Sequence, residues 1–426
     1  MSLQTDNPER VHPPRDPYAA FRHRDYRLYV VGNLVANFGQ QMLTIAVGWE
    51  LYERTRSPMM LGYVGLVQVL PVIALFLPSG HLADRMDRRL ILLAGQLLMA
   101  VASLGLAAIS FVQGPVLLMY LCLLLAGIAN AIKGPARAAL IPQLVPLRIL
   151  GNAAAWSSTT FEIACMSGPA VGGAIIAIAH RAWPVYILDA LAALTFFAFV
   201  WLIPARPRQR PGEPPSLKTL AAGLAFVQRE KVILSAIALD MFAVLLGGAT
   251  TLLPIYAKDI LHVGPQGFGW LRAAPAVGAL VMATVVAHSP PFRRAGRALL
   301  LAVAGFGAVT IVFGLSRSFL LSLAMLFLAG AFDNISVVIR HTLVQVRTPD
   351  ALRGRVSAVN GVFIGSSNEL GGFESGLVAQ LFGPVVSVVA GGIGTIAVVA
   401  GVAGLWPEIR ALGSLADQCP PDEPEV

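Results

Sequence analysis

Long apolar runs separated by short polar breaks make up most of the chain from residue 28 to residue 406. An α-helix rises 1.5 Å per residue, so a run of about 20 apolar residues spans the roughly 30 Å hydrocarbon core of a bilayer. The runs therefore predict twelve membrane-spanning helices. They lie near 28–52, 60–82, 90–112, 116–136, 152–179, 183–203, 232–257, 266–288, 298–315, 318–339, 356–382 and 384–406.

A basic, proline-rich stretch, PARPRQRPGEPPSLKT, follows the sixth run and divides the predicted helices into two groups of six. We therefore expect an all-α integral membrane fold built from two six-helix halves. The predicted organisation is a disordered N-terminal arm (1–20), a first half (21–205), a linker (206–228), a second half (229–407) and a tail (408–426).

The composition supports a membrane protein and excludes a soluble one. Hydrophobic residues make up 56% of the chain, charged residues only 13%, and the mean hydropathy is +0.71, which is far from the values of soluble globular proteins. The N-terminus has no apolar segment of the kind found in a cleaved signal peptide. The three cysteines have no CxxC spacing and the seven histidines do not cluster, so we expect no disulfide framework, no metal site and no cofactor.

The lysines and arginines are unevenly divided between the two sides of the predicted membrane. Of the 31, 25 fall in the arm, linker, tail and loops on the side of the termini, and five fall in loops on the opposite side. Because cytoplasmic loops retain positive charge, both termini are expected in the cytoplasm. This topology and contact with lipid account for the net charge of +8, so no nucleic-acid partner is needed.

An internal repeat relates the two halves. RAALIPQLVPLRIL (137–150) aligns with RHTLVQVRTPDALR (340–353) at an offset of 203 residues, which pairs Arg137 with Arg340. Both segments follow the fourth predicted helix of their half. Parallel repeats of this kind are a known plan of membrane transporters.

The loop GHLADRMDRR (80–89) carries the motif of a known family. With two six-helix halves and a long central loop, the chain resembles the major facilitator superfamily, whose loop signature at this place reads G-x-x-x-D-R-x-G-R-R/K. The matching residues are Gly80, Asp84, Arg85, Arg88 and Arg89, whereas Asp87 replaces the expected glycine. Four further stretches (240–261, 269–279, 352–363 and 368–376) are similar to the bacterial efflux branch that includes the enterobactin exporter. The resemblance implies alternating access, with Asp84 as part of a latch that pairs across the halves near the eleventh predicted helix (356–382).

The fifth predicted helix carries GPAVGG, which resembles the end of the superfamily's antiporter motif. The matching residues are Gly168, Pro169, Gly172 and Gly173, while Ala155 and Ala164 stand at two upstream glycine positions. The resemblance favours export. The alternative is ordinary close packing, because small residues let helices approach and a proline bends them.

Ionisable residues within the apolar runs are the best candidates for transport chemistry, because an unpaired charge in hydrocarbon is costly. The candidates for substrate binding or proton coupling are Glu162, Glu369, Asp240, Asp333, Arg272, Gln40 and Gln41. Glu162 and Glu369 lie about 15 and 20 Å into their helices, close to the midplane. The resemblance places these helices around one central cavity, where a carboxylate can exchange a proton. Alternatively, each acid has a structural partner such as Arg272 or Arg340. Asp189, nearer the outer surface, is expected to be solvated.

Together these features predict a monomeric secondary transporter of a bacterial-type inner membrane, not an enzyme, that exports a small organic molecule in exchange for protons. Drug-like compounds and siderophores are the leading substrate classes. Proton-linked uptake and lysophospholipid flipping remain as alternatives. A membrane sensor or enzyme is a remote one, because the short loops lack a paired nucleophile and base.

Overall fold

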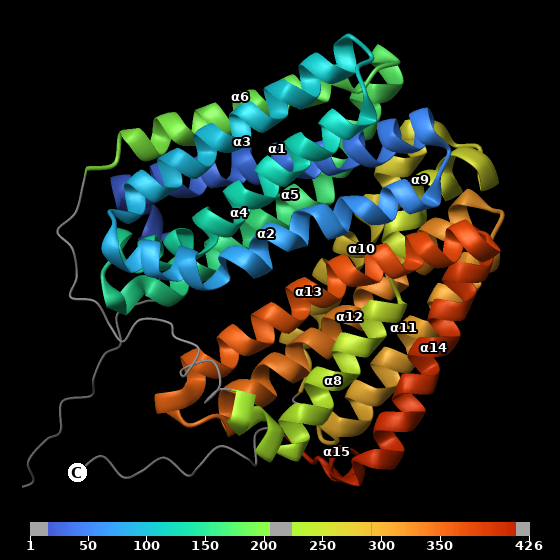
Figure 1. Cartoon of the computed structure of the whole chain (residues 1–426). Helices are drawn as coiled ribbons and strands as arrows, with labels where there is room; N and C mark the ends of the chain where they lie inside the picture. Colours follow the sequence, from blue (N-terminus) through green and yellow to red (C-terminus); the bar gives the residue numbers. More distant parts are fainter. Residues whose placement is uncertain (1–15, 205–223, 291, 415–426) are drawn as a thin grey trace, which may run out of the picture.

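Two helical bundles, one from each half of the chain, make up the computed structural model, which describes residues 16–204, 224–290 and 292–414. The bundles converge at one end and diverge towards the other, as Figure 1 shows. We call the end where α6 stops and α8 starts the linker side, and the end where α1 stops the distal side. The bundles diverge towards the linker side.

Twelve long helices form the bundles within the described residues. The first half holds α1 (Arg24–Thr55), α2 (Pro58–Arg85), α3 (Arg88–Phe111), α4 (Val116–Leu144), α5 (Leu150–Ala179) and α6 (Trp183–Trp201). The second half holds α8 (Lys231–Leu246), α10 (Gly264–Ala287), α11 (Ala295–Leu315), α12 (Phe319–Arg347), α13 (Asp350–Phe382) and α14 (Pro384–Leu405). The short elements are η1 (Ala19–Arg22), η2 (Leu147–Ile149), η3 (Ala249–Leu252), α9 (Leu253–Ile255), η4 (Tyr256–Ile260) and α15 (Pro407–Ala411).

The predicted all-α membrane fold is confirmed, with one difference in the count of apolar spans. Within the described residues, eleven segments are long and apolar enough to cross a membrane. The remaining long helix, α13, is long enough to cross a membrane but is less apolar. Asparagines, serines, glycines, Glu369 and Glu374 replace hydrocarbon side chains in it. A helix of this composition needs protein rather than lipid around its polar face. Its neighbours α2, α8 and α14 supply that environment.

The halves share their helix bounds at the offset of the sequence repeat. Shifting α4 by 203 residues reproduces the bounds of α12. The predicted span over 116–136 was therefore too short, since α4 continues to Leu144 and includes Arg137.

The first spanning segment of the second half is broken, in contrast to the continuous α1. The span predicted over 232–257 corresponds to one apolar segment, Lys231–Ile260, but this segment is not one continuous helix. α8 ends at Leu246, and η3, α9 and the π-helix η4 follow. The break occurs at Gly247 and Gly248, where a Cβ on Gly248 would lie 2.6 Å from the carbonyl oxygen of Gly371 in α13. The glycine pair thus ends the helix and lets two backbones meet.

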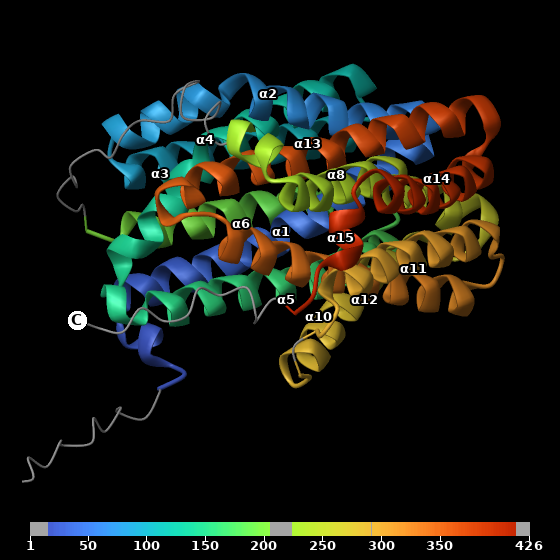
Figure 2. The ribbon, with the colours of Figure 1, turned by 90° about the horizontal axis from the view of Figure 1, so that it is seen from below.

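Two helix pairs join the halves. One pair is α2 with α13, which lie side by side in Figures 1 and 2, and the other is α5 with α10. A buried apolar cluster continues across this junction and includes Trp49 of α1 and Phe268 of α10, whose rings stack at 6.3 Å.

The predicted arm, linker and tail lie largely outside the described residues, but their ends are folded. Residues 16–20, assigned to the disordered arm, pack on α5, where the Trp156 indole N–H donates to the Pro17 carbonyl oxygen at 2.8 Å. Val227, assigned to the linker, is 1% exposed. Residues 407–411, which overlap the predicted tail, form α15 and pack on the start of α11. Apolar side chains in these ends stabilise the contacts.

Candidate functional site

A cavity of about 320 Å³ lies between the halves and is lined by α1, α2, α3 and α4 of the first half and η3, α9, α10 and α13 of the second. Four of the predicted site residues line it: Gln40, Gln41, Arg272 and Glu369. Residues more than 300 positions apart in the sequence thus share one space. We call it the central cavity.

The two halves contribute different chemistry to the central cavity. The first half supplies the amides Gln40, Gln41, Gln68 and Asn130, and the second supplies the charges of Arg272 and Glu369. These two charges attract each other across the site. A Cβ on Gly65 of α2 would lie 2.8 Å from both the carbonyl oxygen and Oε2 of Glu369, so glycine at this position lets α2 approach the backbone of α13 at Glu369. The cavity can bind both donor and acceptor groups of a ligand.

Glu162 lies beside the central cavity but does not line it. It is half-buried in α5, and its charge and that of Arg272 both act on Cys165. The Gln41 side-chain amide donates to Cys165 Sγ at 3.0 Å. Glu162 is therefore close to the wall of the central cavity, behind Cys165 and Gln41.

Asp333 lies in a second cavity of about 190 Å³ inside the second half, which we call the inner cavity. Its walls come from α8, η3, α10, α11, α12 and α13, and Thr250 and Thr251 line both cavities. Within the described residues, Asp333 forms no hydrogen bond or ion pair. The sequence suggested Asp333 as a candidate but not a separate cavity for it.

Asp240 forms an ion pair with Arg340 inside the second half and does not line the central cavity. The two residues are 6% and 2% exposed. In the first half, Arg137 donates to Asn37 Oδ1 at 3.5 Å, and both of these residues stand 203 positions before the charged pair. The contact of Asp240 is thus the structural partnership that the sequence left open as an alternative, made within one half rather than across the two.

The antiporter-like motif of α5 lies at a close contact between the halves. A Cβ on Gly173 would lie 3.1 Å from the Cα of Gly269 in α10. Gly168 and Gly172 face α1, and the Pro169 carbonyl approaches Gly269. These contacts explain the small residues by helix packing, which holds α5 against both α1 and α10.

The signature loop is anchored to the first half. Arg88 Nη1 donates to the Ala139 carbonyl oxygen at 2.8 Å, and Arg89 donates to the carbonyl oxygens of Val200 and Trp201 at the end of α6. The contacts of Arg89 are with the last turn of α6, where a positive charge interacts favourably with the carbonyl end of the helix. Their contacts differ from the predicted pairing across the halves.

Asp87, which replaces a signature glycine, is the N-cap of α3 and accepts a hydrogen bond from the Arg89 backbone N–H at 2.9 Å. Gly80 is buried and Arg85 is exposed. The side chain of Asp84, the centre of the predicted latch, lies outside the described residues.

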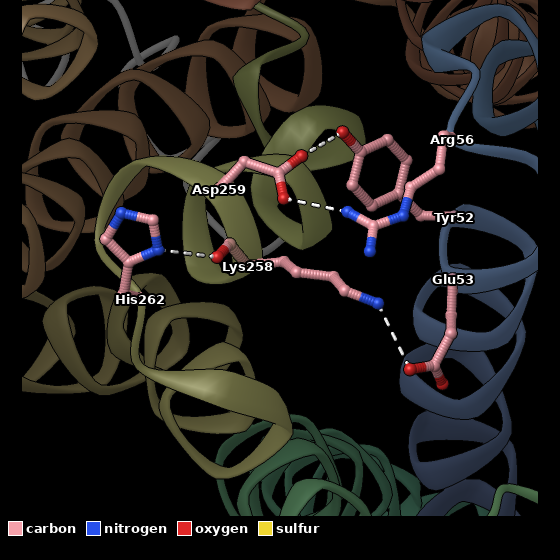
Figure 3. Close-up of polar contacts among 6 residues, drawn as sticks. All are labelled: Tyr52, Glu53, Arg56, Lys258, Asp259 and His262. Carbon is pink, nitrogen blue, oxygen red and sulfur yellow. Dashed lines mark hydrogen bonds and ion pairs between the residues drawn. The ribbon is translucent and has the colours of Figure 1, made fainter.

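A polar cluster on the distal side joins the halves and was missed by the sequence prediction. We call it the distal latch: Tyr52, Glu53 and Arg56 from the end of α1, with Lys258 and Asp259 from η4 (Figure 3). Arg56 Nη1 lies 3.0 Å from Asp259 Oδ1, and Lys258 Nζ lies 3.1 Å from Glu53 Oε1. Tyr52 also donates to Asp259. The sequence did contain a signal for this cluster, because charged residues occur at the end of the first span of each half. The sequence prediction used them only in counting the positive charges of the loops.

Asp189 in α6 is a correction to the sequence prediction. It was expected to be solvated, yet it is 2% exposed and accepts a hydrogen bond from Ser103 at 2.5 Å. Its charge is balanced by Lys133 of α4. The helices bring these residues together inside the bundle, so depth along α6 did not predict the environment of Asp189.

Comparisons with known proteins agree with this geometry. The model of a family described as transmembrane secretion effector matches residues 15–423. Enterobactin exporter EntS of Shigella dysenteriae serotype 1 is 26% identical over 376 residues, covering 87% of this chain and 89% of the relative. EntS of Escherichia coli O139:H28 has the same identity and coverage.

Solved structures share the fold. A bacterial homolog of the human lysosomal transporter Spinster, in an inward-facing and unoccupied conformation, superposes with a TM-score of 0.71 at 13% identity, covering 95% of this chain and 99% of that one. The nucleoside transporter NupG superposes with a TM-score of 0.67 at 12% identity, covering 91% and 98%. The chain therefore belongs to the transmembrane secretion effector family of major facilitator superfamily transporters, and it is not an enzyme.

Proposed function

We propose that this transporter exports a small organic molecule in exchange for protons, with the central cavity as the binding site. The observation that carries the proposal is the position of Glu369 and Arg272, which face the amides of the first half across the central cavity. Intramembrane ionisable residues that face a cavity mark substrate and proton pathways. Drug-like compounds and siderophores are the substrate classes.

Glu369 is the proposed proton carrier. A carboxyl group in an enclosed site favours its neutral form, and a nearby cation favours its charged form. Arg272 supplies such a cation. A substrate that displaces Arg272 from Glu369, or brings its own charge, changes that balance and thereby links substrate binding to proton binding.

Alternating access is proposed to occur by movement of one half against the other about the central cavity. The distal latch joins the halves at one end while the bundles diverge at the other. The distribution of lysine and arginine supports a cytoplasmic linker side and cytoplasmic termini. In this orientation the molecule is open towards the cytoplasm, from which an exporter loads its substrate.

Proton flux in proteoliposomes tests the coupling. Purified full-length protein is reconstituted with a pH-sensitive dye inside, and ethidium or a catecholate siderophore is added under an imposed pH gradient. Substrate-dependent proton movement is expected for the parent protein. Its rate should fall at least tenfold in Glu369→Gln, because a glutamine side chain cannot take up and release a proton. Parent-like proton movement in Glu369→Gln would contradict the assignment.

Glu408→Gln is the matched control, because Glu408 lies on α15 outside the membrane spans and pairs with Lys231. The backbone N–H at the start of α15 and the nearby Lys231 hold the pKa of Glu408 below its usual range. It is therefore charged throughout the assay, and its loss should leave proton flux unchanged. Accumulation of the probe in everted vesicles indicates export, whereas accumulation in whole cells indicates uptake.

A further inference from the structure

The inner cavity has a mostly apolar lining with one acidic side chain. Its walls include Val244, Phe306, Phe313 and Met325, with Asp333 as the one ionisable residue among its described lining residues. Thr310 and Asn368 add neutral polar groups. The space therefore combines a hydrocarbon surface with a negative charge and no lining cation.

Asp333 is a half-buried acid without a partner among the described residues. It forms no ion pair or hydrogen bond with the described residues, although Asp240 and Ser336 lie around the same small gap on its other side. Arg340 already forms an ion pair with Asp240. The charge of this arginine is therefore balanced by an acid other than Asp333. An unpaired acid at membrane depth needs a proton or a cationic ligand.

The break in the first span of the second half connects this acid to the transport site. The end of α8 at Gly247 and Gly248 places Thr250 and Thr251 between the two cavities, where they line both. A helix interrupted at membrane depth is a recurrent feature of substrate sites in transporters. The two cavities therefore adjoin each other at these threonines.

We propose that the inner cavity binds the cationic group and adjoining apolar body of an amphiphilic substrate, with Asp333 as counter-ion. This inference rests on the proposed function for the route of the substrate, and it narrows the substrate class to lipophilic cations. Arg272 and Glu369 balance each other in the central cavity, so the unbalanced charge of the combined site is negative. Like charges disfavour an anion, which argues against catecholate or carboxylate siderophores in this space.

Two dyes with one xanthene skeleton and opposite charge test the proposal. Binding of cationic rhodamine 6G and anionic fluorescein to the full-length protein in nanodiscs is measured by fluorescence polarisation, with empty nanodiscs as background and no ion gradient. The parent protein should bind rhodamine 6G at least tenfold more tightly than fluorescein. Asp333→Asn should weaken rhodamine 6G binding about tenfold, while Asp333→Glu and the control Glu408→Gln should bind it like the parent.

Parent-like rhodamine 6G binding by a folded Asp333→Asn variant, or tighter binding of fluorescein than of rhodamine 6G by the parent, overturns the proposal. Thermal unfolding of each variant shows whether it is folded. If Asp333→Asn does not fold, Asp333→Glu provides the test. Loss of the preference for rhodamine 6G over fluorescein in Asp333→Glu, which retains a carboxylate, also overturns the proposal. Because no gradient is present, this outcome is independent of proton coupling. Proton-driven transport of an anionic compound would leave the proposed function standing and remove only the assignment of the inner cavity.

Discussion

In the first half the buried charges lie inside the bundle, whereas in the second half several of them face a cavity. Lys133 and Asp189 of the first half balance each other between α4 and α6, and the positions 203 residues later hold Ser336 and Gly392. Conversely, Asn130 in the first half corresponds to Asp333 in the second. The halves thus have the same helices but different sites of charge.

The same comparison applies to the first span of each half. α1 is continuous over 32 residues and presents amides to the central cavity. Its counterpart in the second half is broken after Leu246, and the residues that follow the break line both cavities. A repeated fold thus leaves each half free to specialise. The first half supplies a polar surface on a continuous helix, and the second supplies charge and an irregular backbone. Four changes test this division and are given in order of decreasing expected effect.

Removal of Arg340 should have the largest effect. Arg340→Met leaves Asp240 buried without its partner, and breaking a buried ion pair costs about 3–5 kcal/mol. Arg137→Met at the equivalent position of the first half removes a contact to the neutral Asn37, for which about 1 kcal/mol is expected. Thermal unfolding of the purified variants measures both, and Asp240→Asn should restore much of the stability of Arg340→Met. Equal losses in the two halves would contradict the comparison.

Filling the close contact between the break in the second half and α13 should reduce transport by more than tenfold. In Gly248→Ala the new Cβ would lie 2.6 Å from the Gly371 carbonyl oxygen and from Ser375 Oγ, which forces α13 away. Gly401→Ala in α14 is the matched control, because no atom lies within 4 Å of its built Cβ. Transport of rhodamine 6G into everted vesicles is the measurement. Unchanged transport in Gly248→Ala would show that this close contact at the break is not needed.

Weakening the distal latch should produce a moderate shift. Asp259→Asn removes the ion pair with Arg56. The side chains of Arg56 and Asp259 are 58% and 38% exposed, so the free energy of opening is expected to change by about 1 kcal/mol or less. This corresponds to an increase of about three- to fivefold in opening of the distal side. Labelling of a single cysteine placed at Ser57 reports the opening. Glu408→Gln, which breaks an exposed pair within the second half, should leave the labelling rate unchanged.

Moving the acid from the second half to the first should have the smallest effect. Asn130 lines the central cavity at the position that corresponds to Asp333. In the Asp333→Asn background, Asn130→Asp returns one negative charge to the combined site, and a recovery of about two- to threefold in rhodamine 6G binding is expected from this charge at longer range. Full recovery would mean that the inner cavity gives the acid no special position.

Much of the fold was predictable because apolar runs of membrane length and the loop signature are local properties of the sequence. The twelve long helices fall within a few residues of the predicted spans, apart from the broken span and the extended ends of helices such as α4. The candidate site was predictable in part. Gln40, Gln41, Arg272 and Glu369 line one cavity, because charges and amides inside apolar runs must avoid lipid.

Hydropathy and charge act on each segment separately, so the membrane class, the two halves and the residues that cannot face lipid follow from the amino-acid sequence alone. Which of these residues meet depends on the packing of the helices. That packing paired Asp240 with Arg340, buried Asp189 against Ser103, and left Asp333 without a partner among the described residues, in a cavity beside the central one. Those outcomes depend on the rotation and contact of helices distant in the chain, which periodicity within one helix does not specify.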